Sequence, residues 1–381
     1  MKKKKRVCHI STVHSLFDPR IFYKELRSLH KAGYDVYYIV TFERKEIIGG
    51  IKIIPLPTLP NRFFRILFKP MIALIKAIKI NAEVYHFHDP ELIIVGLILK
   101  IVGKKVIYDV HEDYSNFIKE KYYIKLSIIR ELLSITFDIF EKFASRFYDF
   151  VIVATEHIKS KFRNISQDKT IIIQNFPILS IIKKYKAKKE KVYESNKNNF
   201  ILIITGLLDE KRGIKECINA VYIANKKIGK EIFSLWLVGK WGSKKFEHEC
   251  NNLDGWKYVR YLGYLKVQNV YDYLVEANVG LCTFYPTGNN KFSQPTKIYE
   301  YISIGLPVII SNFDYWKKMF TNYGIFVDPL DSNDIADKII YLYSNYDNIK
   351  NKIKKMKKEF VWESEENKLL FTYRKLFKGK I

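Results

Sequence analysis

One segment of the sequence places a helix start next to side chains that suit an anionic ligand. Within residues 293–309, Pro295 stands just before an expected helix, and an apolar strand follows that helix. The first turn of a helix has backbone N–H groups without partners inside the helix, so the amides around Thr296 and Lys297 would bind an anion. Glu300, one turn further on, would accept hydrogen bonds from a pair of sugar or ribose hydroxyls. An ordinary helix with an exposed acid would carry the same residues.

A second segment, residues 205–213, connects an expected strand to the next helix and is rich in glycine and cations. Gly206 and Gly213 permit a tight loop, while Lys211 and Arg212 place positive charge at its mouth. The planar guanidinium of Arg212 would hold a diphosphate through two hydrogen bonds, each charge-assisted bond contributing about 1.5–3 kcal/mol. A solvated basic turn would have the same composition, so this loop does not decide the function alone.

Histidines and acids cluster where two strands of the first half are expected to end. His88 and Asp89 complete and follow the strand of residues 84–88, and His111 follows the strand of residues 105–109. Side chains at the carboxyl ends of parallel strands are well placed to contact ligands. The cluster therefore marks a second candidate site.

The elements that must position these residues alternate between short apolar strands and amphipathic helices. The expected strands lie at residues 6–11, 35–40, 51–56, 84–88, 105–109, 150–154, 200–205, 233–238, 279–283 and 307–310. Nearly continuous apolar strands that alternate with helices indicate parallel sheets covered on both faces. We therefore predict an α/β fold with two Rossmann-like, doubly wound domains that face each other across a cleft, with ligands beyond the carboxyl ends of the strands.

A charged and weakly patterned stretch at residues 178–199 is the expected linker between the two domains. The N-terminal domain would span residues 1–180, and the C-terminal domain would span residues 200–360. A last helix within residues 361–381 would then be able to pack back on the N-terminal domain.

The chain of 381 residues is composed like a folded protein, with 48% hydrophobic and 28% charged residues. Its 65 basic and 40 acidic residues give a net charge of +25, which favours phosphorylated substrates, acidic lipids or nucleic acid as partners. An AT-rich genome would produce much of the same composition. Four separated cysteines indicate a reducing compartment, and no apolar run has the length of a signal peptide or membrane span, so we expect a cytoplasmic protein.

Residues 62–79 mix aromatic and aliphatic side chains with five cations in a helical pattern. A basic, aromatic amphipathic helix suits an anionic membrane surface. Residues 122–147 have a similar character. A helix that faces the core and exposes its lysines would also explain the pattern.

Together, the two anion-binding segments, their order and their separation resemble family 4 of the glycosyltransferases, enzymes of the two-domain GT-B fold. The family carries a Gly-rich loop that ends in Lys-Gly or Arg-Gly, as residues 205–213 do. It also carries a later Pro-x-Lys-(Leu/Ile)-(Phe/Tyr)-Glu-Tyr stretch, as residues 295–301 do. Four further pieces look like the family's remaining strands, at residues 237–239, 261–263, 276–280 and 324–329. The resemblance covers nearly the whole chain.

The resemblance implies roles for the residues singled out above. Arg212 and Lys211 would bind the donor diphosphate together with the amides around Thr296, and Glu300 would bind the nucleotide ribose. His111 would lie near the reacting sugar. Gly206, Gly213, Pro295 and Lys297 complete the expected donor site.

This sequence departs from the family pattern at two positions of the donor site. A second Glu often stands eight residues before Glu300 and holds the donor sugar, but Phe292 occupies that position here. The Arg that commonly follows the first loop glycine is replaced by Leu207. Arg212 would therefore carry more of the phosphate charge.

The loop of residues 14–20 resembles a sub-group of the family that carries Asp-x-Arg-Ile-Phe. We expect Asp18 and Arg20, together with Asp89, on the acceptor side of the site. An Asp turn in which Arg20 opens a helix is an equal alternative.

The histidines raise the question of a bound metal, which the pattern does not favour. We expect His86 and His88 to point to opposite faces of their strand, an arrangement that suits a metal site poorly. The sequence contains no Asp-x-Asp, the usual metal-diphosphate signature of the other large transferase fold. We expect no metal and no other cofactor.

The resemblance implies a retaining transferase that moves a sugar from a nucleotide-diphosphate donor to a glycan or lipid-linked acceptor in cell-surface polysaccharide synthesis. An inverting GT-B transferase and a sugar-nucleotide epimerase of similar fold are the alternatives. We expect the enzyme at the inner face of the plasma membrane, with anionic lipid as a further partner. No nucleic-acid motif is visible, so no nucleic-acid partner is expected.

Overall fold

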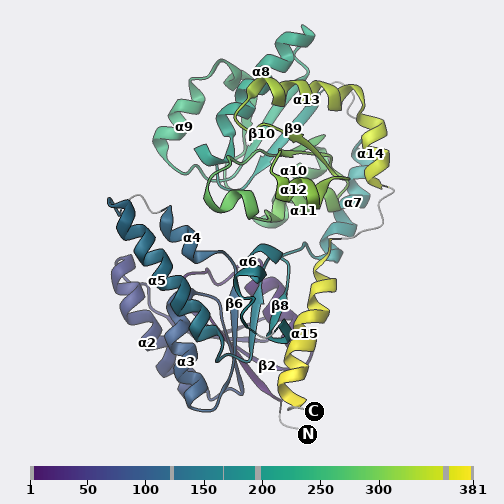
Figure 1. The fold of residues 1–381 in the computed structure, drawn as a ribbon. Coiled ribbons are helices and arrows are strands. Elements are labelled where there is room, and N and C mark those ends of the chain that lie inside the picture. The colour runs from purple at the N-terminus through teal and green to yellow at the C-terminus, as the bar shows by residue number, and fades with distance from the viewer. Residues whose placement is uncertain (1–3, 121–123, 166, 194–198, 355–359, 379–381) are drawn as a thin grey trace. The chain divides into compact units, whose positions relative to one another are not determined.

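The structure is a computed structural model in which the chain divides into two compact units. The first unit comprises Met1–Asn175 and Trp362–Ile381, and the second comprises Phe176–Val361. The residues described are 4–120, 124–165, 167–193, 199–354 and 360–378. Each unit is built around one sheet with helices on its faces (Figure 1).

The described part of the first unit contains an eight-stranded sheet with the order β3-β4-β2-β1-β5-β6-β7-β8. All neighbouring strands are parallel except the antiparallel pair β3 and β4. The strands are β1 (Arg6–Ile10), β2 (Asp35–Thr41), β3 (Glu46–Ile48), β4 (Ile51–Leu56), β5 (Val84–Phe87), β6 (Lys105–Val110), β7 (Phe150–Val153) and β8 (Thr170–Ile172). Because β1 lies between β2 and β5, the strand order reverses there, and the carboxyl ends of β1 and β5 form the usual ligand position of such sheets.

The first unit owes one of its helices to the end of the chain. Its helices are η1 (Ile21–Leu26), α1 (Arg27–Lys31), α2 (Arg62–Ile80), η2 (Pro90–Leu92), α3 (Ile93–Ile101), α4 (Tyr114–Lys119), α5 (Ser127–Ser145), α6 (Glu156–Lys161), η3 (Gln167–Lys169) and α15 (Trp362–Lys378). Helix α15 packs beside η1 and α1, where the Trp362 indole donates a hydrogen bond of 3.0 Å to the Ser28 hydroxyl. The sheet is therefore covered on one face by elements from both ends of the chain.

The second unit contains, within the described ranges, a six-stranded parallel sheet with the order β11-β10-β9-β12-β13-β14. Its strands are β9 (Phe200–Thr205), β10 (Phe233–Val238), β11 (Val259–Tyr261), β12 (Val279–Cys282), β13 (Val308–Ser311) and β14 (Gly324–Val327). Every residue of β9 is buried, because apolar clusters cover both faces of the sheet. The strand order reverses between β9 and β12, so their carboxyl ends form the corresponding ligand position.

The helices of the second unit connect these strands in sequence order. They are α7 (Leu179–Tyr193), η4 (Glu210–Arg212), α8 (Ile214–Ile228), α9 (Lys244–Asn251), η5 (Asp254–Tyr258), α10 (Val267–Glu276), η6 (Gly288–Phe292), α11 (Thr296–Ser303), α12 (Asp314–Phe320), α13 (Ser332–Ser344) and α14 (Tyr346–Lys354). Across all described helices of both units, none is long and apolar enough to cross a bilayer.

The stretch predicted as a linker, residues 178–199, is largely helical, and this expectation was wrong for most of its length. Helix α7 places Ile182 and Tyr185 in the apolar core of the second unit. The Lys189 ammonium donates to three backbone carbonyl groups at the end of α10. Only a few residues of this helix pack into the core, and they are interspersed among many lysines. The charged composition therefore gave no clear helical pattern.

Candidate active site

The predicted glycine loop of the second unit lies at the carboxyl ends of β9 and β12. Gly206 follows β9 with a φ of +104°, and Gly213 follows η4 with a φ of +69°. Residues other than glycine rarely adopt such values. A β-carbon on Gly213 would come within 2.3 Å of the carbonyl oxygen of Thr283. Glycine therefore allows the loop to pack directly against the end of β12.

Two cations from the two predicted segments meet at one aromatic ring. The Arg212 guanidinium lies 4.5 Å from the centroid of Phe284, and the Lys297 ammonium lies 5.3 Å from it. Cations at this distance are attracted by the negative face of the ring. The Asp209 carboxylate lies 3.8 Å from Arg212. The structure thus brings the Gly-rich loop and helix α11 to a common point.

The Lys297 side chain is the least compensated charge of this group. Its ammonium is buried and has no hydrogen-bond partner among the described residues. It lies 3.4 Å from the position that a β-carbon on Gly206 would take. Burial, with a smaller contribution from Arg212, lowers the pKa of Lys297 to about 8. A buried cation without an anion is costly, so an anionic ligand at this point would be stabilised.

The start of α11 and its acid lie on the same helix as Lys297. Pro295 is the extended residue before the helix, and Thr296 is its first residue. The Glu300 carboxylate accepts a hydrogen bond of 3.3 Å from the Tyr271 hydroxyl, whose pKa is raised well above its usual range by burial and by Glu300. One short helix therefore supplies backbone N–H groups, a cation and a carboxylate.

The other positions discussed for the donor site are Lys211, Leu207 and Phe292. The carbonyl of Lys211 accepts a hydrogen bond of 2.8 Å from the Tyr285 amide, which fixes the loop backbone. Leu207 is exposed, and Phe292 packs its ring near Tyr315. Sequence reasoning assigned the charge of the missing loop arginine to Arg212, but the structure also places Lys297 beside the first loop glycine. The donor roles of these residues stay predictions.

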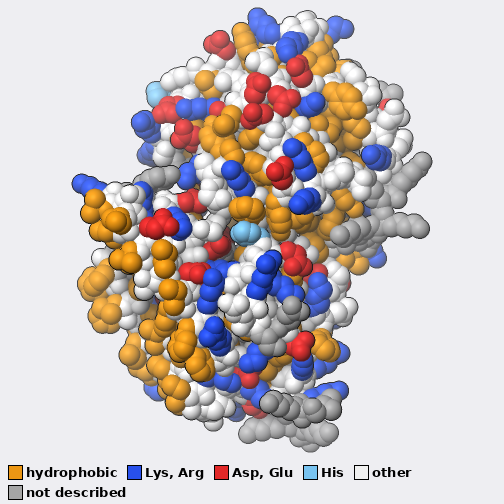
Figure 2. Space-filling model, in the orientation of Figure 1, with side chains coloured by type: hydrophobic (Ala, Val, Ile, Leu, Met, Phe, Trp, Pro, Cys, Tyr) orange, Lys and Arg blue, Asp and Glu red, His pale blue; other side chains and the backbone are white. Residues whose placement is uncertain are grey.

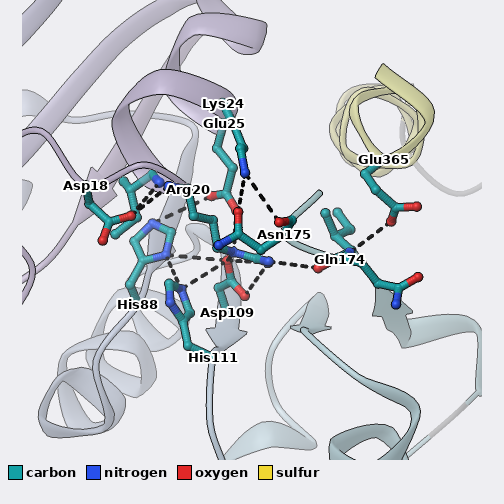
Figure 3. A network of polar contacts seen from close by, with 12 residues as sticks. Asp18, Arg20, Lys24, Glu25, His88, Asp109, His111, Gln174, Asn175 and Glu365 are labelled. Atoms are coloured by element: carbon teal, nitrogen blue, oxygen red, sulfur yellow. Dashed lines mark hydrogen bonds and ion pairs between the residues drawn. The ribbon is translucent and has the colours of Figure 1, made fainter. Parts of the chain in front are cut away.

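In the first unit, His111 lies at the edge of a buried polar network (Figure 3). The network is centred on Asp109 of β6, whose carboxylate accepts hydrogen bonds from the Arg20 guanidinium at 3.0 and 3.2 Å. Arg20 also donates to the Ile173 carbonyl at 2.8 Å. The Glu25 carboxyl lies 2.9 Å from the same guanidinium. One buried cation therefore faces two carboxyl groups.

These two carboxyl groups titrate in opposite directions. Burial and the charge of Asp109 raise the pKa of Glu25 well above its usual range. Burial alone would also raise the pKa of Asp109, but Arg20 and His111 outweigh it and hold that pKa well below its usual range. Like charges so close cannot both be ionised at neutral pH. Asp109 is therefore the carboxylate of the pair, and Glu25 is the neutral acid.

The expectation that His86 and His88 point to opposite faces of β5 was wrong. Residues two apart in a strand share a face. Their rings stack with centroids 4.7 Å apart, and both side chains are fully buried. His9 of β1 lies beside them on the same face, since it pairs with His86 across the sheet. Sequence reasoning did not single out His9 or Glu25. His9 is a polar residue within an apolar strand, which is a visible signal, whereas Glu25 stands beside Lys24 in an amphipathic helix and has no such signal.

Two groups of these side chains could each hold a metal ion, because their ligand atoms lie within 4.8 Å of one another. They are His9, Glu25, His86 and His88, and His88, Asp109 and His111. The first group is already joined by a hydrogen bond of 2.9 Å between His9 Nδ1 and His88 Nε2. A proton between these atoms leaves no lone pair for an ion there. The absence of a metal stays a prediction.

Two of the residues predicted on the acceptor side, Asp18 and Arg20, lie in the loop before η1, and the third, Asp89, lies between β5 and η2. Asp18 accepts hydrogen bonds from the amides of Arg20 and Ile21, both at 2.9 Å, and thus opens η1. Asp89 is buried and accepts hydrogen bonds from Ser11 and Thr12. Arg20 is also buried, so Arg20 and Asp89 would influence a ligand through the groups that they hold. The acceptor-side assignment stays a prediction.

Two α/β units on largely parallel sheets, each with polar residues at the point where the strand order reverses, have the architecture of the GT-B fold of glycosyltransferases. The chain belongs to family 4 of the glycosyltransferases. Residues 20–176 match the family described as Glycosyltransferase Family 4, and residues 199–345 match Glycosyl transferases group 1. The sequence resemblance is thereby confirmed, as is the prediction of two doubly wound α/β domains of the GT-B class, and the protein is a transferase enzyme.

Solved structures of the same fold match the chain from end to end. Sucrose-phosphate synthase from Thermosynechococcus elongatus is 18% identical, with a TM-score of 0.71 over 99% of this chain and 100% of that chain. A glycosyltransferase from Rickettsia africae is 15% identical, with a TM-score of 0.68 over 99% and 100%. Anabaena HepE in complex with UDP-glucose is 13% identical, with a TM-score of 0.69 over 97% and 99%. A search of curated protein sequences gave no match.

Proposed function

We propose that the enzyme is a retaining transferase whose second unit binds the diphosphate of a nucleotide-sugar donor. The observation that carries this proposal is the buried Lys297 ammonium, which has no hydrogen-bond partner in the described chain and lies beside Gly206 and Arg212. A pyrophosphate would supply the missing anion. The structure of Anabaena HepE with UDP-glucose supports a donor of this class.

Negative charge builds on the leaving diphosphate as the bond to the sugar breaks. Arg212, Lys297 and the first amides of α11 would stabilise this charge, and they need no rearrangement because the fold already holds them in place. Glu300 would bind the ribose hydroxyls from the same helix. Retention is proposed from the family resemblance, in which the departing phosphate helps to take the proton of the acceptor.

The first unit would bind the acceptor, with His111 near the reacting sugar. His111 is only partly buried, whereas the histidines behind it are inaccessible. It is therefore the member of the network that a ligand can touch. Asp18 is also partly exposed and bonds the His14 ring at 3.1 Å, on the same side of the network.

One set of measurements tests the proposed function. Calorimetry with UDP-, GDP- and ADP-sugars should reveal one donor class that binds the wild type and binds the Lys297→Met variant far more weakly. NMR of the product should show the anomeric configuration of the donor. The opposite configuration would show an inverting transferase, and conversion of the donor without acceptor would show an epimerase.

We further propose that the acceptor is lipid-linked, in cell-surface polysaccharide synthesis at the inner face of the plasma membrane. A broad apolar surface on the first unit supports this. Helix α3 contacts both α2 and α5, and these three helices expose large apolar side chains: Phe63, Leu67, Met71, Ile75, Ile78, Ile94, Ile101, Ile128, Leu132 and Ile139. Figure 2 shows apolar side chains gathered over the region of α2 and α5.

The charge around this apolar surface favours anionic lipid as its occupant. Arg62, Lys76 and Lys79 lie on α2 among the exposed apolar residues, and the chain carries a net charge of +25. Basic residues beside an inserted apolar face strengthen binding to anionic headgroups. The described chain shows no helix that could span a bilayer, so the proposed contact is peripheral.

A further inference from the structure

A continuous chain of side-chain contacts links the C-terminal helix of the protein to His111. The Tyr373 hydroxyl of α15 lies 2.9 Å from His9 Nε2 and 3.0 Å from His86 Nδ1. His9 Nδ1 lies 2.9 Å from His88 Nε2. His88 Nδ1 lies 3.1 Å from His111 Nε2. All of these residues belong to the first unit.

The buried members of this chain are uncharged at neutral pH. Burial lowers the pKa of His86, and it lowers the pKa values of His9 and His88 well below the usual range. Burial also raises the pKa of the Tyr373 hydroxyl well above its usual range. A neutral imidazole has one N–H and one lone pair, and a phenol has one O–H. Each contact therefore has one donor and one acceptor. Within the described residues the Tyr373 hydroxyl has hydrogen-bond partners only in the rings of His9 and His86, so its O–H points to one ring and accepts from the other, and the donors follow one another in a single direction.

The Asp109 carboxylate distinguishes the two directions. Its Oδ2 lies 3.7 Å from His86 Nε2, 3.4 Å from His111 Nε2 and 3.5 Å from His88 Nδ1. In the first direction, each donor points along the chain from His111 toward His86. The N–H protons of His111 Nε2 and His86 Nε2 then face the carboxylate, and only the lone pair of His88 Nδ1 is turned toward it. In the opposite direction, the lone pairs of His86 Nε2 and His111 Nε2 face the carboxylate, and only His88 Nδ1 presents a proton to it. Electrostatics therefore favour the first direction.

The first direction assigns every proton in the relay. With its proton on Nε2, His86 accepts the Tyr373 O–H at Nδ1. Tyr373 then accepts the N–H of His9 Nε2, so the Nδ1 lone pair of His9 accepts from His88 Nε2. His88 Nδ1 in turn accepts the N–H of His111 Nε2. The His111 ring therefore has its proton on Nε2 and its lone pair on Nδ1.

We propose that Tyr373 is a positioning residue that fixes His111 as the Nε2–H tautomer, acting through His9, His86 and His88. The inference rests on the proposed function only in taking His111 as the ring near the reacting sugar. Besides His88 and Asp109, the groups around His111 within the described residues include the His14 ring, with its centroid 4.8 Å away, the Asp18 carboxylate and the His86 ring. With this tautomer, Nδ1 is the ring atom that would accept a hydrogen bond from a substrate hydroxyl.

The first test needs no substrate and reads the tautomer directly. Histidine ring nitrogens are labelled with ¹⁵N in the full-length protein, and the His111 signals are assigned from a His111→Gln sample. We expect a protonated Nε2 and an unprotonated Nδ1 in the wild type. In Tyr373→Phe we expect the Nε2–H fraction to fall. A protonated Nδ1 in the wild type, or an unchanged tautomer in Tyr373→Phe, would overturn the proposal.

The second test asks whether the tautomer matters for turnover. If only the Nε2–H form is competent, kcat falls in proportion to its population, by about two- to tenfold for a fraction of roughly 0.5 to 0.1. We expect that loss in Tyr373→Phe with an unchanged donor KM. Tyr34→Phe is the matched control, because its ring contacts Tyr373 outside the relay. Equal kcat values for the two variants would overturn the positioning role.

Three further outcomes of these experiments can be interpreted. Should Tyr373→Phe fail to fold, His9→Gln interrupts the same chain at the next residue and is scored in the same way. A divalent metal bound at His9 Nδ1 and His88 Nε2 in the purified protein would replace the proton between them and overturn the relay. Absence of any transferase activity would remove the proposed function, while the tautomer measurement would still decide the relay.

Discussion

The Nζ atom of Lys297 lies 3.4 Å from the position that a β-carbon on Gly206 would occupy. At the end of β9, the buried ammonium of Lys297 thus lies beside the backbone of Gly206, which carries no side chain. No side chain of the loop separates them, so a ligand phosphate could touch both. The chemistry of the donor site can be tested at this pair first.

Donor binding should weaken as the pH rises above about 8. The pKa of Lys297 is about 8 in the free protein, and an anionic ligand prefers the charged ammonium. Binding above that pH therefore requires proton uptake, and the affinity falls by up to about tenfold per pH unit. Calorimetry of donor binding between pH 7 and 9.5, in buffers with different ionisation heats, measures this uptake. Lys297→Met should bind weakly with no such pH dependence, and a flat wild-type profile would contradict the assignment.

Replacing Arg212 by Ala should lower kcat by roughly a hundredfold, the usual effect of removing one group that stabilises charge in the transition state. The fold should survive, because Arg212 lies on the surface of the Phe284 ring rather than inside the core. Arg260→Ala is a matched control, since this guanidinium also lies over an aromatic ring, 5.1 Å from Trp236. Similar kcat values for both variants would remove Arg212 from the site.

Glu300→Gln should raise the donor KM by about five- to tenfold, because a charged acceptor of the ribose hydroxyls becomes a neutral one. Stability should change little, since the Tyr271 hydroxyl can still donate to the amide oxygen. Steady-state kinetics with thermal unfolding as a control separates the two effects. The surface variant Glu249→Gln should leave KM unchanged. If Glu300→Gln lowers the melting temperature without raising KM, the residue is structural.

Gly213→Ala should cost more stability than Gly229→Ala. The two glycines have nearly the same φ, +69° and +71°, so the backbone strain is alike at about 1 kcal/mol. Only at Gly213 would the new methyl group meet an atom, the Thr283 carbonyl oxygen at 2.3 Å. We expect Gly213→Ala to be destabilised by about 2 kcal/mol or more in urea unfolding. Equal losses would show that the loop moves away from β12 at little cost.

The apolar surface of α2, α3 and α5 should bind anionic vesicles. Leu67→Glu with Leu132→Glu should abolish cosedimentation with phosphatidylglycerol vesicles, because two exposed apolar side chains that would insert into the membrane become charged. Ile47→Glu is the control, since it adds the same charge at an exposed apolar position on β3. Neutral vesicles should bind the wild type more weakly. Dimerisation of the wild type without vesicle binding would instead identify a second copy as the occupant.

Local patterns in the sequence determined most of the architecture. The predicted strands at residues 200–205 and 233–238 coincide with β9 and β10, because buried parallel strands are continuous apolar runs. Short edge strands such as β3 and β8 were not predicted, since three residues carry too little pattern. Helix α7 was missed because the lysines on its surface outnumber the apolar residues that hold it.

The donor side of the site was more accessible to sequence reasoning than the acceptor side. Gly206, Arg212 and Lys297 belong to two short motifs, and in each motif the neighbouring residues in the sequence are also neighbours at the site. The relay joins His9, His88 and Tyr373, which lie far apart in the sequence and meet only through tertiary packing. Tyr373 looked like one aromatic among several in the last helix, and no local pattern distinguished its hydroxyl.

The position of α15 in the first unit has a consequence for synthesis in the cell. Residues 6–175 leave the ribosome first, but Trp362 and Tyr373 follow only after the whole second unit, roughly 10–40 s later at 5–20 residues per second. During that interval the nascent sheet lacks one of the helices on that face, and Ser28, His9 and His86 lack the hydrogen-bond partners that α15 supplies. The first unit therefore reaches its final state only after α15 has been translated.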